Sequence, residues 1–262
     1  MKCCGIREEP ASGNGFCSTR HRYRLGEASD GCQDVGMTGS LLDLAIYSYA
    51  DVDRLSGLHP GTARRWLDGY ERGGRFYDPV LRPEAVNSDV VTWGEMVEAR
   101  LLAEFRSRGV SVQRLRPAVV MLRQEFGRYP LAQARPFLDV AGRELIRVIQ
   151  DEVGLERELR LVVVRNGQLV LDTPAQRFRD AVEYVGDEAG RLTPVVQTPH
   201  VLMDPRRSFG QPAIRNVRTE SLAEDFRAGT SREELADLYD LTAEQVDEAI
   251  RFEMISGSGR AA

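Results

Sequence analysis

The sequence has few of the residues from which catalytic and metal sites are most often built. Its 262 residues include four cysteines and three histidines, and Lys2 is the only lysine. Even with His21 as a further ligand, the cysteines fit no two-pair zinc pattern; they are Cys3, Cys4, Cys17 and Cys32. No apolar run approaches the roughly 20 residues that a membrane-spanning helix needs. These absences predict a protein with no metal site, no cofactor and no membrane anchor.

Catalytic motifs are also missing. The histidines are far apart in the sequence, and there is no glycine-rich phosphate loop or paired-histidine metal motif. Carboxylates are abundant, but they fall on the outward faces of the expected helices, where solvation is their ordinary role. The opening residues lack the apolar core of an export signal. We therefore expect a cytoplasmic protein that is not an enzyme.

Charge is unevenly distributed along the chain, whose net charge is −5. Residues 41–130 carry 13 arginines against 12 acidic residues, whereas residues 131–262 carry 17 against 23. This asymmetry favours a front part that contacts nucleic acid and a back part that contacts another partner. Residues 1–40 are rich in Gly, Ser and Arg without periodicity, which predicts disorder, and Met37 resembles an alternative start.

The stretch 49–70, YADVDRLSGLHPGTARRWLDGY, predicts two short helices around a tight turn. Gly57 ends the first helix, and His59-Pro60 opens the second, because proline is tolerated in a first turn. An inward stripe at helical spacing is formed by Ala63, Trp66 and Leu67. The residues left facing outward are Thr62, Arg64 and Arg65. This pattern predicts a helix–turn–helix that enters a major groove, and the alternative is an ordinary helical hairpin with a solvated basic face.

The next residues predict a wing, a small hairpin that lays its arginines on phosphates. Gly73-Gly74 supplies the turn, and the alternative is a plain loop. We expect Arg72 and Arg75, which flank the turn, to bind phosphates beside the groove. We expect the outward residues of the second helix to read base edges or to anchor the recognition helix; these are Thr62, Arg64 and Arg65.

Two longer helices are expected after the wing. The first runs from Thr92 to about Arg108, and the second carries Pro117, which either kinks the helix or marks a start near Arg116. Six arginines lie between residues 106 and 128 against a single glutamate, Glu125. They either contact phosphates beside the groove helix or solvate an outer face.

Residues 129–200 predict a small mixed α/β region. Asn166-Gly167 between apolar runs is the strongest hairpin signal in the chain. Further hairpins are expected over 137–146, although 144–152 could equally be helical, and over 182–196. Pro199 and Pro205 mark a linker.

The last 60 residues predict three helices and a second helix–turn–helix outline. Capping boxes open two of the helices, at Ser231 and Thr242. The exposed face is acidic, and it consists of Glu233, Asp237, Asp240, Glu244, Asp247 and Glu248. Because such a face repels phosphate, we interpret this module as a protein-contact or dimerising module.

Both helical modules resemble known bacterial families. The C-terminal stretch resembles a small family of unknown function, and the matching residues are Gly210, Pro212, Ile214, Arg218, Gly229, Glu233, Glu234, Leu241, Thr242, Val246 and Ala249. A Gly-Thr-Arg-Ile-Pro-Val run usual in that family is replaced here over 216–221, where Arg218 alone remains. The front stretch resembles the helix–turn–helix of MerR regulators. In this order, the two modules resemble VapB-type antitoxins.

That resemblance implies a homodimer that binds operator DNA, represses its operon and neutralises a PIN-like ribonuclease toxin. The expected fold is α+β and mainly helical, with a winged helix–turn–helix, a mixed middle region and a C-terminal helix–turn–helix-like domain. The expected segments are 1–40 (disordered), 41–128 (DNA-binding), 129–200 (middle) and 201–262 (antitoxin-type). The alternative is a MerR-like transcriptional regulator with a small-molecule effector, which needs an apolar cavity within 129–200. A structural adaptor that never touches nucleic acid is a third hypothesis.

Overall fold

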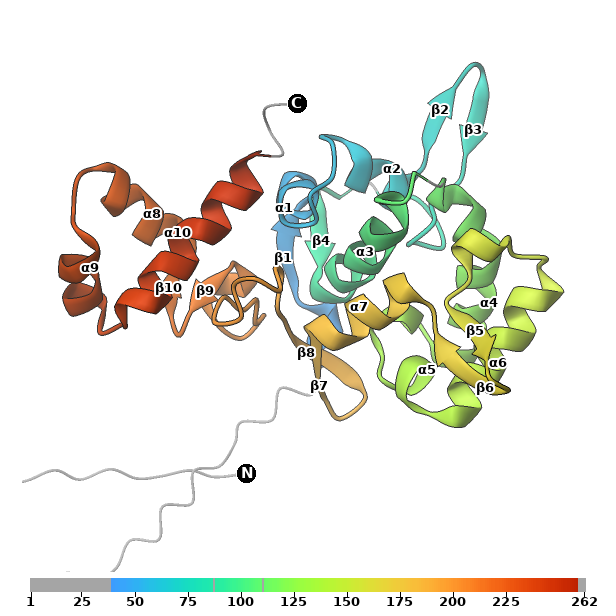
Figure 1. The fold of residues 1–262 in the computed structure, drawn as a ribbon. Helices are drawn as coiled ribbons and strands as arrows, with labels where there is room; N and C mark the ends of the chain where they lie inside the picture. The colour runs from blue at the N-terminus through green and yellow to red at the C-terminus, as the bar shows by residue number, and fades with distance from the viewer. Residues whose placement is uncertain (1–38, 87, 110, 259–262) are drawn as a thin grey trace, which may run out of the picture. The chain divides into compact units, whose positions relative to one another are not determined.

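The computed structural model describes residues 39–86, 88–109 and 111–258 (Figure 1). The four cysteines and the expected disorder of residues 1–38 lie outside the described residues. The described chain is a mixed α+β fold, about half helical, and its strands form two-stranded antiparallel sheets.

The front part alternates short strands with helices. In chain order its elements are η1 (Leu41–Asp43), β1 (Ala45–Ser48), α1 (Tyr49–Leu55), α2 (Thr62–Asp68), β2 (Tyr70–Arg72), β3 (Arg75–Tyr77), β4 (Val90–Thr92), α3 (Trp93–Arg106), η2 (Val112–Leu115) and α4 (Arg116–Phe126). Strand β1 pairs with β4, so the chain leaves α1 and α2 and returns beside the strand that precedes them. Strands β2 and β3 form a hairpin that projects beyond α2 (Figure 1).

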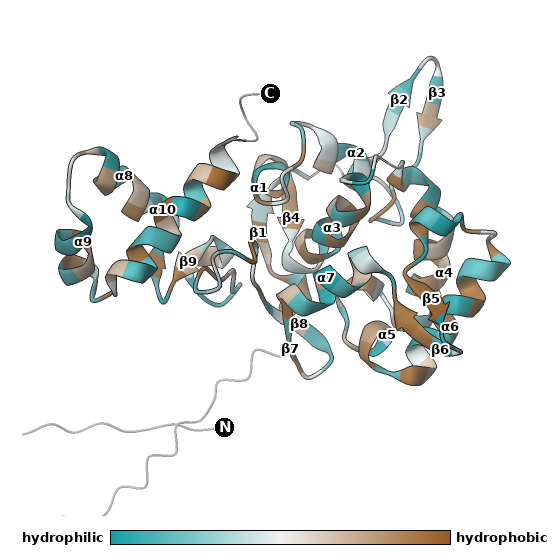
Figure 2. Cartoon of the chain, in the orientation of Figure 1, coloured by the Kyte–Doolittle hydropathy of each residue, from teal (hydrophilic) through white to brown (hydrophobic). Residues whose placement is uncertain are grey.

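The remaining elements form a middle region and a helical C-terminal region. The middle elements are η3 (Pro130–Ala132), α5 (Arg135–Leu138), α6 (Val140–Glu152), η4 (Arg157–Leu159), β5 (Val162–Arg165), β6 (Gln168–Leu171), α7 (Thr173–Ala181), β7 (Val182–Val185) and β8 (Glu188–Leu192). The last elements are η5 (Ser208–Gly210), β9 (Ala213–Ile214), β10 (Val217–Arg218), α8 (Thr219–Arg227), α9 (Arg232–Tyr239) and α10 (Ala243–Ser258). Strand β5 is hydrophobic along most of its length (Figure 2).

Helix α3 is the centre of the larger core. A capping box between Thr92 and Glu95 starts the helix, and Trp93 is fully buried. The Trp93 indole N–H donates to the carbonyl oxygen of Ala189 at 2.6 Å. Gly94 lets the Tyr129 ring lie against the helix, since a Cβ there would be 2.7 Å from a ring carbon. One core therefore joins the front part to the middle region.

The C-terminal helices enclose a smaller core of their own. Its buried members include Leu222, Leu235, Val246, Ala249 and Phe252, contributed by α8, α9 and α10. The Leu235 and Val246 side chains are completely buried, as the amphipathic spacing of these helices requires.

Several sequence predictions are confirmed in this fold. Helix α4 begins at Arg116 with Pro117 in its first turn, so the proline starts the helix instead of kinking it. Asn166 and Gly167 both have positive φ and close the β5–β6 hairpin. Ser231 opens α9 with a complete capping box.

Other predictions were wrong. The expected hairpin over 137–146 is instead the helix pair α5–α6, which cross so closely that a Cβ on Gly142 would lie 2.1 Å from the carbonyl oxygen of Arg135. The hairpin expected over 182–196 turns earlier, because its second strand is Glu188–Leu192. The expected linker packs into the fold, with Val201 and Met203 fully buried. Among the described helices, none has the length and apolarity needed to cross a membrane.

Candidate nucleic-acid interface

Helix α2, which carries the predicted base-reading residues, is held at its first turn by a residue of α1. Gly61 is its N-cap and supplies no side-chain oxygen. The buried Asp53 carboxylate takes that role, accepting from the Gly61 amide at 2.6 Å and the Ala63 amide at 2.7 Å. The helix begins at Thr62, so the prediction that His59-Pro60 opens it was wrong. A remote carboxylate thus fixes α2 against α1.

The two faces of α2 are sharply divided. Ala63, Trp66 and Leu67 are buried against the core. Arg64 and Arg65 are exposed on the opposite side, and Thr62 is half-buried. The structure thus has the predicted outward arrangement for Arg64 and Arg65 and only in part for Thr62, whereas the contact of all three with DNA stays a prediction.

The opposite end of α2 is clamped by a buried ionic network centred on Arg82. This guanidinium donates to both oxygens of Glu95, at 2.7 and 3.0 Å, and to Asp68 at 2.8 Å. Tyr49 joins the network by donating to Asp68 at 2.5 Å. Burial lowers the pKa of Arg82, but the hydrogen bonds and charge of Glu95 raise it more, so the net shift is upward. Burial and the bond to Asp68 raise the pKa of Tyr49 to about 12.

The β2–β3 hairpin carries Arg72 and Arg75 beside its turn. The two residues are directly opposite each other in the register, an arrangement in which like charges repel. Tyr70 and Tyr77 stack behind them with ring centroids 4.9 Å apart. Arg75 lies 5.3 Å over the Tyr77 ring, whereas Arg72 has no bonded partner among the described residues. A bound anion would relieve this repulsion.

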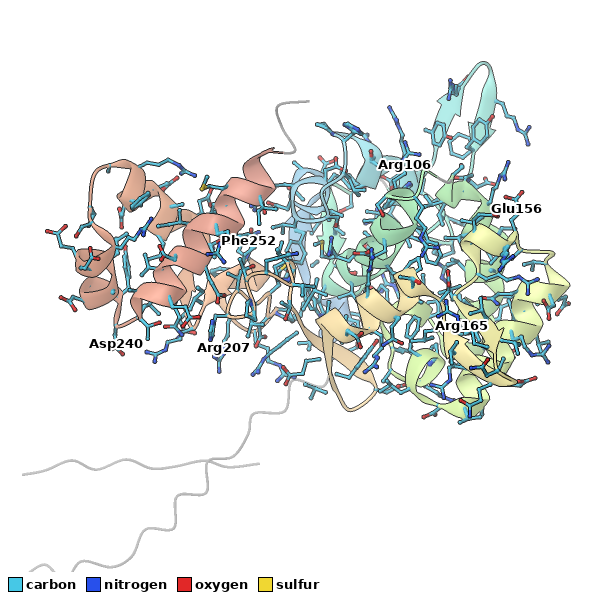
Figure 3. The ribbon with its side chains drawn as sticks, viewed as in Figure 1. Arg106, Glu156, Arg165, Arg207, Asp240 and Phe252 are labelled. Carbon is cyan, nitrogen blue, oxygen red and sulfur yellow. The ribbon has the colours of Figure 1, made fainter. Side chains whose placement is uncertain are left out.

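A hollow of about 440 Å³ lies between α2 and the hairpin. Its lining includes Arg65, Arg72 and Arg106, with Glu71 as an acidic member. Arg106 is the last residue of α3, and Figure 3 shows it near the base of the hairpin. Three arginines from three elements thus converge on one open depression, which suits a phosphate.

Arg106 differs from the other arginines between residues 106 and 128, which bind to the chain itself. Their bonded groups are Asp172 for Arg108, Glu156 for Arg114, Asp78 and the Pro79 carbonyl for Arg116, the Leu81 carbonyl for Arg123, and Asp43 for Arg128. These arginines join segments of the fold, and Arg114 and Arg128 are also solvent-exposed, so their contact with phosphates stays a prediction. Arg106 has no bonded partner among the described residues. Sequence reasoning missed it, since the pattern alone does not separate it from its neighbours.

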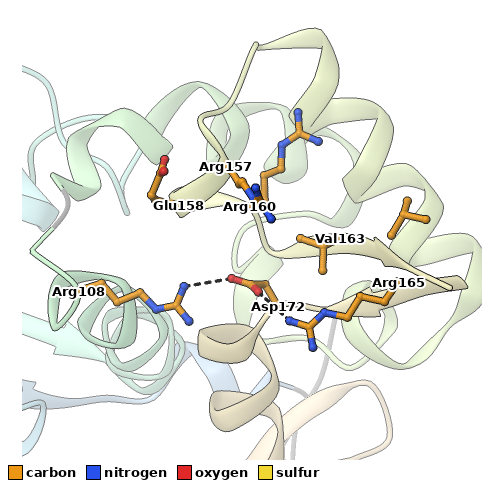
Figure 4. Close-up of a pocket in the computed structure, with 8 residues that line it drawn as sticks. Arg108, Arg157, Glu158, Arg160, Val163, Arg165 and Asp172 are labelled. Atoms are coloured by element: carbon orange, nitrogen blue, oxygen red, sulfur yellow. Dashed lines mark hydrogen bonds and ion pairs between the residues drawn. The ribbon is translucent and has the colours of Figure 1, made fainter. Parts of the chain in front are cut away.

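A second hollow, of about 610 Å³, lies in the middle region (Figure 4). Arg108 and Arg165 reach Asp172 from opposite sides, at 3.2 and 3.5 Å. Arg157 and Arg160 also line it. Most of its lining residues are charged, and Glu158 and Asp172 offset only part of the charge of the four arginines.

Comparison with known proteins identifies relatives over most of the chain. Uncharacterized protein Rv2308 of Mycobacterium tuberculosis (strain ATCC 25618 / H37Rv) is 40% identical over 229 residues, which are 84% of this chain and 94% of that protein. The chain belongs to the same family as Rv2308. Residues 201–252 also match the family model described as a protein of unknown function, DUF433.

Two further matches come from Mycobacterium tuberculosis, one among protein sequences and one among solved structures. A protein of the same strain named "Putative antitoxin VapB45" is 27% identical over 230 residues, covering 79% of this chain and 93% of its own length. The X-ray crystal structure of Rv2018 superposes with a TM-score of 0.64 at 25% identity, covering 80% of this chain and 99% of that one. The antitoxin-like character predicted from the sequence is therefore supported at the level of a distant relative.

Proposed function

We propose that this chain is an antitoxin of a type II toxin–antitoxin system. It binds operator DNA as a dimer, represses its operon and neutralises a PIN-like ribonuclease toxin, without being an enzyme itself. The relative named "Putative antitoxin VapB45" supports the toxin–antitoxin role, because the similarity covers 79% of the chain.

The observation that carries the DNA-binding part is a set of arginines free of acidic partners on one surface. These are Arg64, Arg65, Arg72, Arg75 and Arg106, and none of them forms an ion pair with a described residue. Arginine is the preferred side chain for bidentate contact with phosphates and with guanine. A surface that leaves five of them without a carboxylate favours a polyanionic partner.

The roles of these residues follow from their places in the fold. Helix α2 presents Thr62, Arg64 and Arg65 to base edges, with Trp66 packed in the core behind them. Arg72, Arg75 and Arg106 then lie beside the groove helix and bind flanking phosphates. Two copies of the chain would read half-sites about 34–36 Å apart.

Fluorescence anisotropy tests the DNA contact. The probe is a labelled duplex from the region upstream of the chain's own gene, titrated at several salt concentrations. Arg64→Ala with Arg65→Ala should lower affinity at least about tenfold and relax the preference for the operator over other duplexes, as expected when base contacts are lost. The matched control replaces Arg177 and Arg227, two exposed arginines on other elements. Equal affinity in the two double variants would favour the structural adaptor.

Co-expression with the product of the neighbouring reading frame tests the toxin contact. An antitoxin should co-purify with a small nuclease in fixed stoichiometry and suppress cleavage of RNA. The MerR-like regulator remains the alternative, and it needs an apolar cavity within 129–200. The hollow beside β5 and β6 is lined by four arginines and is not an apolar cavity of that kind.

A further inference from the structure

The C-terminal region exposes an aromatic side chain in a strained backbone. Ser208 and Phe209 are consecutive residues at φ 47° and 53°, and Phe209 is 73% exposed. A bulky residue at positive φ costs on the order of 1–3 kcal/mol, and solvent exposure of the ring does nothing to offset that cost. The next residue, Gly210, is fixed because its carbonyl accepts from the Tyr47 hydroxyl at 2.6 Å. The loop is thus held in a shape that displays Phe209.

Basic side chains surround this aromatic ring. The Arg218 guanidinium lies 5.9 Å from the ring centroid, and a hollow of about 630 Å³ beside it is also lined by Arg206 and Arg207. We call this set, Arg206, Arg207, Phe209 and Arg218, the Phe209 edge. It combines one exposed aromatic ring with three arginines, of which Arg207 also lies 3.9 Å from the Asp204 carboxylate.

Helix α9 carries the opposite combination. Leu238 is 68% exposed, and Glu233 and Asp237 are exposed one turn apart. Neither carboxylate forms an ion pair with a described residue. We call Glu233, Asp237 and Leu238 the Leu238 face. It has one apolar projection among negative charges.

The two surfaces are neighbours. Tyr239, next to Leu238, lines the hollow of the Phe209 edge. At the end of α9, Arg215 in the turn of β9–β10 donates to the carbonyl of Asp240 at 2.7 Å and to its carboxylate at 3.0 Å. In the view of Figure 3, Arg207 and Asp240 lie along the same lower edge of this region. A basic apolar half therefore lies beside an acidic apolar half.

We propose that this edge is the interface of a two-fold dimer of the chain. A patch with adjacent halves of opposite charge is complementary to itself after a rotation of 180°, as an isologous interface requires. Phe209 of each copy packs on Leu238 of the other, and Arg206 and Arg207 face Glu233 and Asp237. The pairing occurs twice, and each occurrence buries two exposed apolar side chains. The inference deepens the proposed function by naming the surface that brings two α2 helices onto one operator.

Charge reversal on the full chain tests this interface by sedimentation velocity between about 1 and 100 µM. Arg206→Glu with Arg207→Glu makes both halves acidic, and Glu233→Arg with Asp237→Arg makes both halves basic. Each variant alone should be monomeric, with a dissociation constant raised at least about tenfold. An equimolar mixture should dimerise again, because both contacts then join opposite charges. This rescue also shows that both variants are folded.

Two further variants address the apolar contact and the control. Phe209→Ala should weaken the dimer although the charge of the Phe209 edge is unchanged. The control Arg177→Glu, on α7, should leave the dimer intact. A monomeric wild-type chain, dimeric reversal variants or a mixture that stays monomeric would each overturn the proposal. Binding of a monomeric variant to a single half-site duplex is measured separately, so a failure of DNA binding is distinguished from a failure of the interface.

Discussion

The helix pairs α1–α2 and α9–α10 have a similar outline and opposite surface chemistry. The outward side of α2 carries Arg64 and Arg65, whereas the outward side of α9 carries Glu233 and Asp237. Only the first can approach a phosphate backbone without repulsion. Helix pairs of similar outline can therefore serve different functions, and the charges of their exposed residues distinguish them.

The pairs also differ in how they are anchored. Helix α2 is held at both ends by buried charged groups, Asp53 at its start and Arg82 at its end. Helix α9 relies on an apolar residue, Leu235, and on a capping box at its exposed start. Removing one partner of a buried ion pair leaves an uncompensated buried charge and lowers the unfolding free energy strongly. Loss of a contact should therefore destabilise α2 more than α9.

Removing the charge of Arg82 should have the largest effect. Arg82→Met leaves Glu95 buried without a counter-charge and should cost about 3–5 kcal/mol of unfolding free energy. Urea denaturation followed by circular dichroism measures this loss.

The matched control is in the C-terminal region. The exposed Arg232 pairs with the half-buried Asp247 at 2.9 Å, and Arg232→Met should cost at most about 1 kcal/mol. Similar losses in both variants would mean that α2 is not clamped by buried charge.

Two buried glutamates should respond oppositely to amidation. Glu98 is completely buried; one oxygen accepts from the Leu131 amide and the other has no partner. Burial, opposed in part by that hydrogen bond, raises the pKa of Glu98 to about 8. The unfolded chain loses this proton near pH 4.5, so stability should fall by about 1.4 kcal/mol per pH unit between those values.

Glu98→Gln should remove this slope and stabilise the protein at pH 8, because the amide keeps an acceptor for Leu131. Glu248, which the sequence wrongly placed on the exposed acidic face, is the counterpart in the smaller core, where its two oxygens contact the backbone and ring nitrogens of His200 at 2.9 and 2.8 Å. Glu248→Gln should destabilise. Thermal unfolding at pH 5, 6.5 and 8 compares them, and parallel pH profiles for wild type and Glu98→Gln would contradict the assignment.

Substitution of Arg106 and of Arg108 compares an arginine that has no bonded partner among the described residues with a paired arginine on the same segment. Arg106→Ala should lower operator affinity several-fold and reduce the salt slope by about one, as for a single phosphate contact. Arg108→Ala should leave the slope unchanged, because that guanidinium already binds Asp172. Anisotropy titrations measure both slopes. Equal slopes would remove Arg106 from the interface.

The sequence was informative where structure is local. The Asn166-Gly167 hairpin, the Pro117 helix start and the Ser231 capping box depend on residues within a few positions of one another. The outward arginines of α2 follow from helical spacing around Trp66.

Long-range contacts were beyond such reasoning. Asp53 caps a helix that starts nine residues later, and Arg82 joins groups from four different elements or loops. Helix α5 is too short for periodicity to separate helix from strand, whereas α6 is amphipathic and contains the helix that the sequence left open over 144–152. The candidate DNA-binding site was therefore the part of the molecule least predictable from sequence, because only tertiary contacts show that Arg106 has no bonded partner among the described residues while its neighbours are paired.

The smallest expected effect concerns the capping boxes that open α1 and α9. Ser48 accepts from the Asp51 amide, and Ser231 accepts from the Glu234 amide, each in a complete capping box at an exposed helix start. Ser48→Ala and Ser231→Ala should each cost about 1 kcal/mol. Since the two helices pack in different cores, the double variant should lose the sum within about 0.5 kcal/mol. A larger discrepancy in urea denaturation would mean that the two regions are coupled, and the Tyr47–Gly210 hydrogen bond would then be the first contact to remove.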